Sequence, residues 1–263
     1  MNCRLCNHND LKLYYQVGNK KQFNFYKCKK CGLVNLDINN INIYENQVKY
    51  EENFIDPLDK KKNPGSFSTY KYIAKKIKSK GNYIDIGCGN GSLLNYARED
   101  GWDVKGLEIS DFLAKKVKEK LNIEVETGNF IEFKDIHPAY NLLTLRHVLE
   151  HIPDSIRAMK IINNLLLDEG YAVLEFPNIE GFSFKFKRFL DKFGLYNKKY
   201  KPDFKPGHCN EFSRKSFKYL SNISGFELID WQTYSNKETL NLFYSIFKIA
   251  TKARVLIKKV KTV

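Results

Sequence analysis

The chain of 263 residues is long enough to bury the core of one α/β domain, with room for a small additional module. No apolar leader follows Met1 and no apolar run reaches the length of a membrane span, so we expect neither a secreted nor an integral membrane protein and place it in the cytoplasm. The 44 basic and 30 acidic residues give a net charge of +14, which favours an anionic partner or surface without identifying one.

Four of the six cysteines lie in the first 31 residues as two C-x-x-C pairs, Cys3 with Cys6 and Cys28 with Cys31. Each pair presents two thiolates to one metal ion, and two pairs complete a tetrahedral Zn²⁺ site. Disulfides are disfavoured in the cytoplasm, so zinc is the first interpretation and a redox pair the second. Because the segment between the pairs alternates like strands, residues 1–36 are predicted to form a zinc ribbon that needs its metal to fold.

Residues 37–80 are predicted to be a connector that ends in a helix. The segment is polar and contains a lysine run at 60–62, which is typical of a solvated face. Tyr70, Ile73 and Ile77 have the spacing of a helix over 68–77.

The segment 83–100 reads as a strand, a tight turn and a helix. Gly87, Gly89 and Gly91 occupy alternate positions in the turn, where the absence of a Cβ lets a ligand approach the backbone. A dinucleotide site would have the spacing G-x-G-x-x-G, and Asp85, just before the turn, would repel a pyrophosphate. That carboxylate suits a cationic ammonium, such as the methionine end of S-adenosylmethionine.

Each of the next two predicted strands leads to a polar side chain. The strand 102–107 ends at Glu108, whose carboxylate can accept hydrogen bonds from both ribose hydroxyls of a nucleoside. The strand 123–126 is followed by Asn129 and Phe130, where the asparagine is expected to meet the adenine.

With these residues the chain resembles the class I S-adenosylmethionine-dependent methyltransferases, over about residues 81 to 230. The resemblance implies an α/β fold, a Rossmann-like seven-stranded sheet within 81–263, preceded here by the small zinc ribbon. It implies S-adenosylmethionine as the cofactor and a leading helix that helps to cover it. The residues expected to bind the cofactor are Asp85, Gly87, Gly89, Gly91, Glu108, Asn129, Phe130 and Arg146.

The fourth predicted strand, 140–145, opens into a polar cluster that should face the transferable methyl group. The sequence of this cluster, His147-x-x-Glu150-His151, matches a metalloprotease motif. The segment follows a strand of a nucleotide-binding fold, however, whereas the protease motif would lie in a long helix. It resembles the LEH signature of small-molecule methyltransferases. Three alternatives stay open: direct catalysis, capping of the next helix, and a divalent ion held by the three side chains.

A helix over 154–167 and a fifth strand over 171–176 lead into a long segment rich in aromatic and basic residues. We interpret about 179–210 as a substrate lid, in which Lys185, Lys187 and Arg188 meet phosphates. Packing of its phenylalanines on the sheet is the favoured alternative for those side chains. His208 follows the lid and is the first choice for a general base, with His147, His151 and Glu150 as further catalytic candidates.

The closing part of the chain is predicted to contain a helix over 214–221 and a strand over 226–231. The residues Leu240, Phe243, Ile246, Phe247 and Ala250 have helical spacing. A final antiparallel strand is implied by the resemblance but has no clear position in the sequence. The basic tail, 237–263, is explained by core packing or, as a second interpretation, by contact with a membrane surface.

The resemblance extends to bacterial methyltransferases that act on nucleotide-linked sugars and on capsule or other surface-polysaccharide precursors. It implies a small anionic or nucleotide-linked acceptor, a sugar or a phosphoramidate-type group. An RNA methyltransferase that uses the ribbon and the positive charge to hold RNA is the alternative enzyme. A zinc-ribbon binding module with a non-catalytic cofactor-binding fold is the alternative without activity.

Overall fold

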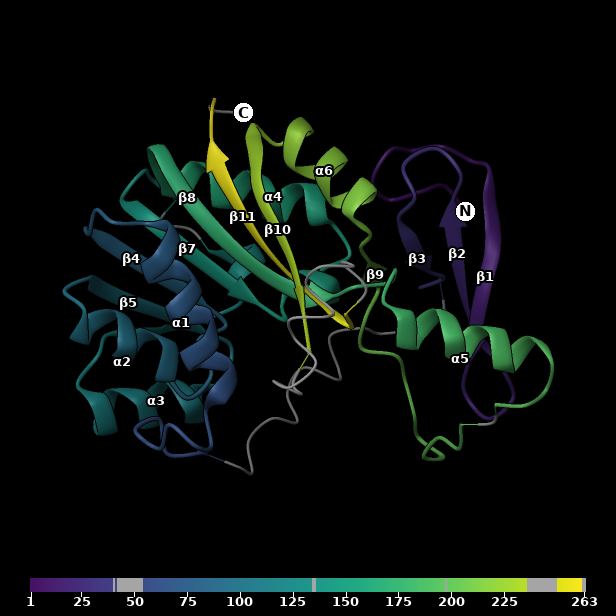
Figure 1. Ribbon diagram of the computed structural model, residues 1–263, viewed down its shortest axis with the longest axis horizontal. Coiled ribbons are helices and arrows are strands. Elements are labelled where there is room, and N and C mark those ends of the chain that lie inside the picture. Colours follow the sequence, from purple (N-terminus) through teal and green to yellow (C-terminus); the bar gives the residue numbers. More distant parts are fainter. Residues whose placement is uncertain (40, 42–53, 134–135, 197, 236–249, 262–263) are drawn as a thin grey trace.

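The computed structural model describes the chain except for residues 40, 42–53, 134–135, 197, 236–249 and 262–263. The described residues form a seven-stranded sheet in the order β10-β11-β8-β7-β4-β5-β6 and a four-stranded sheet in the order β1-β2-β3-β9 (Figure 1). The larger sheet contains β4 (Asn82–Ile86), β5 (Asp103–Glu108), β6 (Val125–Thr127), β7 (Tyr140–Arg146), β8 (Leu166–Pro177), β10 (Phe226–Tyr234) and β11 (Lys252–Lys259).

The strand directions give this sheet a parallel part and an antiparallel edge. β4 pairs in parallel with β5 and β7, β5 with β6, and β7 with β8, whereas β11 is antiparallel to both β8 and β10. The strand order reverses at β4, and α/β sheets bind ligands beside the carboxyl ends of strands at such a point. The predicted seven-stranded α/β fold is confirmed.

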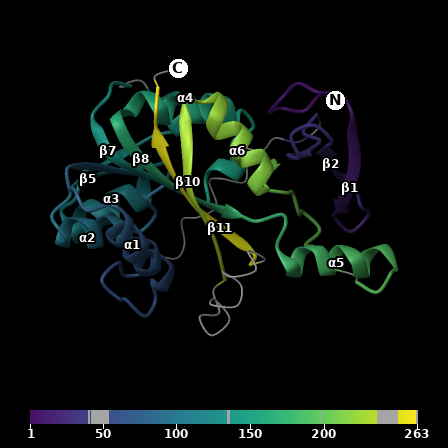
Figure 2. The ribbon, with the colours of Figure 1, turned by 45° about the horizontal axis from the view of Figure 1, so that its top comes forward.

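Both faces of the large sheet are covered by helices, because its strands alternate apolar side chains between two buried layers. Tyr83, Leu142 and Val173 belong to the layer shared with α1 (Pro64–Lys76), α2 (Ser92–Glu99) and α3 (Asp111–Leu121). Neighbouring residues such as Ile84 and Leu143 belong to the layer shared with α4 (Ser155–Leu165) and α6 (Arg214–Ile223). Figures 1 and 2 show the two groups of helices on opposite sides of the sheet.

The small sheet joins the N-terminal segment to a distant part of the chain. β1 (Leu11–Val17), β2 (Phe23–Cys28) and β3 (Val34–Leu36) form an antiparallel ribbon, and β9 (Asn210–Glu211) pairs with β3. Arg4 reinforces this junction, since its Nη1 donates to the Leu36 carbonyl at 2.8 Å and its Nε to Asn210 at 3.1 Å. The ribbon therefore packs as one body with the segment that precedes α6.

The boundary between α4 and β8 differs from the predicted one. The helix ends at Leu165, and the strand already begins at Leu166, which pairs with Tyr140. The segment 168–170, between the predicted helix and strand, is part of a bulge in the strand: Glu169 has a positive φ of 63°, and the register shifts before Leu142 pairs with Tyr171.

The second interpretation of the tail, membrane contact, is wrong for residues 252–259. They form β11, whose Ala253, Val255, Leu256 and Ile257 are at most 2% exposed between β8 and β10, so core packing is confirmed there. This is the antiparallel strand that the resemblance implied. Of the residues with helical spacing, Leu240, Phe243, Ile246 and Phe247 lie outside the described residues. In the described part of the chain, no helix has the length and apolar character required to cross a bilayer.

Candidate active site

A cavity of about 600 Å³ opens at the carboxyl ends of β4, β5 and β7, where the strand order reverses. Eight of the residues predicted to bind the cofactor or to act in catalysis line it: Gly87, Gly89, Glu108, Asn129, Phe130, Arg146, His147 and His151. Four do not line it: Asp85, Gly91, Glu150 and His208. The structure thus brings together residues from four successive strand ends.

The glycine turn has the conformation and the space that a bound nucleoside requires. Gly89 has a φ of 56°, and a Cβ built on it would meet no atom within 4 Å, so the turn leaves room against the cavity. Gly91 serves the packing instead, because a Cβ there would lie 2.7 Å from the Val117 side chain. It precedes the first turn of α2 and keeps that helix close to α3.

Glu108 is held in position by the backbone of two loops. Its Oε2 accepts a hydrogen bond from the Gly89 amide at 2.8 Å and its Oε1 from the Ser110 amide at 3.1 Å. Each carboxylate oxygen can accept a second bond, and the side chain, 7% exposed, borders the cavity. Such a fixed carboxylate fits the two adjacent hydroxyls of a ribose.

Glu108→Gln is expected to weaken S-adenosylmethionine binding by roughly ten- to a hundredfold, because a charge-assisted hydrogen bond contributes about 1.5–3 kcal/mol. Titration calorimetry measures the affinity. Glu126→Gln is the matched control, since Glu126 lies on the neighbouring strand and pairs with Lys105 outside the cavity. Equal affinities of Glu108→Gln and the wild type would refute the proposed ribose contact.

Asn129 and Phe130 follow β6 and border the same cavity. The Asn129 Oδ1 accepts from the Ile131 amide at 3.2 Å and caps a short 3-10 helix, η3 (Phe130–Glu132). The cap fixes the amide beside a wall formed by apolar side chains, Phe130 among them, which suits an adenine ring.

Asp85 lies behind the turn instead of in the cavity. Its side chain is 2% exposed and accepts a hydrogen bond from the Thr144 hydroxyl, which also contacts the Tyr83 hydroxyl at 2.6 Å. Burial raises the pKa of Asp85 from 3.8 to about 7. The carboxyl therefore titrates near neutral pH, and a cationic ligand close to it would lower its pKa again.

Asp85→Asn is expected to become more stable relative to the wild type as the pH rises. The folded state holds the Asp85 proton more tightly than the unfolded chain, so the wild type loses stability between about pH 4 and pH 7, by on the order of 1–4 kcal/mol. Asparagine does not titrate. The unfolding temperatures of the ligand-free wild type and variant, measured across this pH range, test the expected difference in stability. The control is Asp103→Asn, because Asp103 is an exposed carboxylate on β5. A constant difference between variant and wild type would contradict it.

Arg146 belongs to a buried cluster of charged side chains, with Glu175 and Arg254. Glu175 lies between Arg146, whose Nε is 3.0 Å from one carboxylate oxygen, and Arg254, which contacts the other. Burial by itself raises the pKa of Glu175, but the two guanidiniums outweigh it and lower the pKa to about 2. Two cations share one carboxylate here, so the cluster keeps one positive charge, and Arg146 presents it to the cavity.

Two histidines line the cavity and a third lies beside them. The carbonyl of Gly207 can only accept, so the His151 Nδ1, 2.9 Å away, carries the proton, and in the neutral ring Nε2 is left as a base. His208 packs its ring edge-to-face on His151, with the centroids 4.9 Å apart. Partial burial lowers the pKa of His208 and favours its neutral form. This geometry favours His151 over His208 as the group that meets an acceptor.

Glu150 is buried between these histidines. Its Oε1 lies 3.3 Å from the His147 Nδ1, and its Oε2 is buried without a hydrogen-bond partner among the described residues. The segment is a 3-10 helix, η4 (Leu149–His151), in which the metalloprotease motif has no long helix to support it. Among the described residues of this cluster, the ligand atoms that all lie within 4.8 Å of one another belong to Glu150, His151 and His208, so an ion held by His147, Glu150 and His151 together is not the arrangement found.

Some residues that line the cavity have no recognisable signal in the sequence. Ile55 and Asn63 come from the connector, and Asn90 of the glycine turn holds them there: its Nδ2 donates to the Ile55 carbonyl and to Asn63 Oδ1, each at 2.8 Å. The connector thus closes one side of the cavity. Its polar composition alone could not reveal this contact.

The four N-terminal cysteines form a compact donor set. The Sγ atoms of Cys3 and Cys31 are 3.5 Å apart, as are those of Cys6 and Cys28, and all four lie within 4.8 Å of one another. A disulfide would need about 2.05 Å, whereas tetrahedral zinc with Zn–S bonds of about 2.3 Å separates its sulfurs by about 3.8 Å. The set therefore fits one zinc ion with no position left for a substrate.

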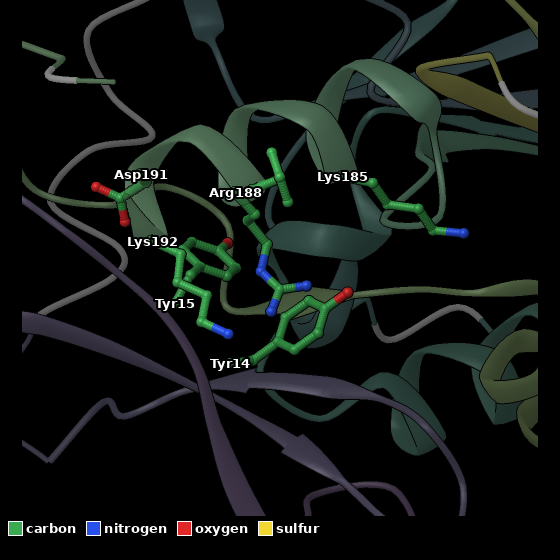
Figure 3. A pocket seen from close by; sticks show the side chains of 7 residues that line it. Tyr14, Tyr15, Lys185, Arg188, Asp191 and Lys192 are labelled. Carbon is green, nitrogen blue, oxygen red and sulfur yellow. The ribbon is translucent and has the colours of Figure 1, made fainter. Parts of the chain in front are cut away.

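A second cavity, of about 370 Å³, lies between β1 and the helix α5 (Phe182–Lys192) of the predicted lid. Figure 3 shows the Arg188 guanidinium over the Tyr14 ring, 3.4 Å from its centroid, with Lys185 and Lys192 on the same helix. Asp191 also borders it but pairs with Lys21 at 3.1 Å. Three cations thus surround a small space, and Lys187, the third predicted phosphate ligand, does not line it.

The fold and the first cavity define a class I methyltransferase: a sheet with an antiparallel β10-β11 edge, and a glycine turn facing a second-strand glutamate. Residues 60–230 match the family model described as "Methyltransferase domain". The chain belongs to this methyltransferase family.

Curated relatives carry quinone-biosynthesis names. The chain is 30% identical over 96 residues to the ubiquinone biosynthesis O-methyltransferase of Coxiella burnetii, which covers 34% of this chain and 41% of that protein. It is 26% identical over 210 residues to the demethylmenaquinone methyltransferase of Staphylococcus carnosus, covering 71% of this chain and 87% of that protein. The match thus spans less than half of the Coxiella protein and most of the Staphylococcus protein.

Solved structures share the fold at low sequence identity. The magnesium protoporphyrin IX methyltransferase of Synechocystis, solved with bound S-adenosylhomocysteine, aligns with a TM-score of 0.54 and 14% identity over 74% of this chain and 82% of that one. A methyltransferase structure from Listeria monocytogenes, described as putative, aligns with a TM-score of 0.55 and 15% identity over 75% and 99%.

Proposed function

We propose that this methyltransferase transfers the methyl group of S-adenosylmethionine to an oxygen of a small anionic acceptor. The observation that carries the proposal is a shared cavity: Gly89 and Glu108 line one part of it, His147 and His151 another. A cofactor held at Glu108 and an acceptor held at the histidines would therefore meet in one cavity.

The proposed mechanism divides the work between the two sides of the cavity. S-adenosylmethionine, when bound, supplies a methyl group on a cationic sulfur. Glu108 and Asn129 orient the nucleoside, and the net positive charge at Arg146 attracts a carboxylate. On the acceptor side His151 Nε2 takes the hydroxyl proton as the oxygen–carbon bond forms and the carbon–sulfur bond breaks. Glu150 stabilises the histidine cluster as it becomes positively charged.

The acceptor's charge is inferred from the second cavity. Tyr15, which borders that cavity, interacts with the buried carboxyl of Glu211, and Glu211 Oε1 lies 4.0 Å from the His208 Nδ1. Tyr15 and Glu211 thus connect the cavity bordered by Lys185, Arg188 and Lys192 with the histidines. A nucleotide-linked or phosphorylated substrate would place its phosphate at these cations and its acceptor oxygen at His151. A sugar precursor of a surface polysaccharide is such a substrate.

The names of the relatives favour a second candidate, a hydroxylated precursor of quinone biosynthesis. Its recognition would depend on the apolar walls of the first cavity and not on the basic second cavity. The two candidates therefore differ in their response to the same substitution, Arg188→Gln.

The test is an acceptor panel incubated with S-adenosylmethionine: nucleoside-diphosphate sugars, sugar phosphates, hydroxylated quinone precursors and RNA. Mass spectrometry detects the gain of a methyl group. We expect methylation of a phosphorylated sugar, with a KM raised by Arg188→Gln. Methylation of a quinone precursor with an unchanged KM would favour the second candidate. Methylation of RNA alone, or cofactor binding without turnover, would overturn the proposal.

A further inference from the structure

The helix α5 carries an aromatic surface that faces away from the rest of the molecule. Phe182, Phe186, Phe189 and Phe193 are 50–60% exposed, and Leu195 just beyond the helix is 72% exposed. Their spacing of four, three and four residues places the phenylalanines on one face of the helix. We call this set of five residues the aromatic stripe. Packing of these phenylalanines on the sheet, the favoured alternative from the sequence, is wrong.

The opposite face of α5 is attached to the ribbon. Phe184 packs edge-to-face on Tyr15 with the ring centroids 5.1 Å apart, Arg188 stacks on Tyr14, and Asp191 pairs with Lys21. Figures 1 and 2 both show α5 beside the ribbon at the periphery, away from the large sheet. The helix is therefore docked by one side, and the aromatic stripe is left exposed on the other, with Phe189 at its edge also lining the second cavity.

The charges around the aromatic stripe are almost all positive. Between Gly181 and Lys201 the sequence has seven basic residues and one acid, Asp191, which is used on the ribbon side. Lys185, Lys187 and Lys192 are exposed, and among the described residues none of them has a carboxylate within salt-bridge distance. At 100° per residue, Lys185 and Lys192 flank one edge of the stripe and Lys187 lies beyond the other.

We propose that the aromatic stripe docks the protein onto an anionic lipid surface. An apolar helix face bordered by lysines lies in the plane of a bilayer interface, with its aromatic rings below the headgroups and its lysines at the phosphates. A second copy of this chain would bring like charges together, which opposes self-association. Membrane contact, which was the second interpretation of the basic tail, is thus proposed for α5 instead.

Co-sedimentation of the full-length protein with vesicles tests this proposal. The wild type should bind phosphatidylcholine vesicles that contain phosphatidylglycerol, and should bind pure phosphatidylcholine much more weakly. The double variant Phe186→Ser with Phe193→Ser should lose roughly thirty- to a hundredfold in partition coefficient, since each half-buried ring contributes about 1 kcal/mol or more. Ile229→Ser, which removes a 45% exposed apolar side chain from β10, should bind as the wild type does.

A second pair of variants tests the charge. Lys187 and Lys199 are exposed lysines of the segment 181–201. Lys187→Gln with Lys199→Gln should weaken binding to the anionic vesicles roughly thirtyfold, at about 1 kcal/mol per lysine near the surface. Lys115→Gln with Lys118→Gln, on α3, removes the same charge elsewhere and should have little effect. Failure of the wild type to bind anionic vesicles would overturn the proposal, as would equal binding by the double phenylalanine variant. Self-association that depends on Phe186 and Phe193, without vesicle binding, would assign the stripe to a second copy and overturn it too.

Discussion

Cys28→Ser is expected to release zinc and unfold the ribbon while cofactor binding persists. Structural zinc contributes about 10–16 kcal/mol of apparent binding free energy in zinc-finger peptides, more than a short ribbon can replace by packing. β1, β2 and β3 belong to the small sheet, whereas Glu108 ends β5 of the large sheet and Gly89 lies in the turn after β4. The loss should therefore be local and should appear first as reduced solubility.

Metal analysis and hydrogen exchange measure these effects. The wild type should contain one zinc per chain, and in Cys28→Ser the amides of β1–β3 should exchange fast while those of β4 and β5 stay protected. Cys88→Ser, a buried cysteine outside the cluster, should keep its zinc. Absence of zinc from freshly purified, reduced wild-type protein would contradict the assignment.

His151→Asn is expected to lower kcat by roughly 10²–10⁴-fold, the usual contribution of a positioned general base. Because only the neutral ring accepts the acceptor's proton, the wild-type pH–rate profile should have an acidic limb on which the rate rises with pH, and this limb should vanish in the variant. Cofactor affinity should change little. The measurement is a pH–rate profile with the acceptor identified from the panel.

His208→Asn separates the base from its neighbour. His208 contacts His151 by its ring and does not line the cavity, so this variant should lose less activity and keep the pH dependence. His137→Asn, an exposed histidine, serves as the control. If His208→Asn lost the pH dependence and His151→Asn kept it, the base would be His208, as the sequence first indicated.

The features that the sequence predicted well are those set by short-range patterns. The glycine turn after β4 and the cysteine pairs are each encoded within a few residues, so their positions follow from spacing alone. Glu108 could be found in the same way, because a parallel strand that follows the glycine helix ends at the same edge of the sheet.

The features that it missed depend on contacts between distant segments. The pairing of Asn210 with Asn35 joins segments that no local pattern connects. The same holds for the hydrogen bond between Asn90 and Asn63 and for the interaction of Tyr15 with Glu211. The exposure of the aromatic stripe is another example, since a helix with one apolar face is normally assumed to bury it. The choice of His151 over His208 as the general base depended on the Gly207 carbonyl, which fixes the tautomer of His151.

The position of β11 has a consequence for how the chain reaches its native state during synthesis. β8 and β11 are neighbours in the sheet, yet β8 ends at Pro177 and β11 begins only at Lys252. Until the ribosome has delivered residue 259, the edge of β8 has no partner and its apolar side chains stay accessible to other chains. The nascent protein should therefore depend on chaperones late in translation, and slowing elongation between residues 177 and 252 should increase aggregation rather than folding yield.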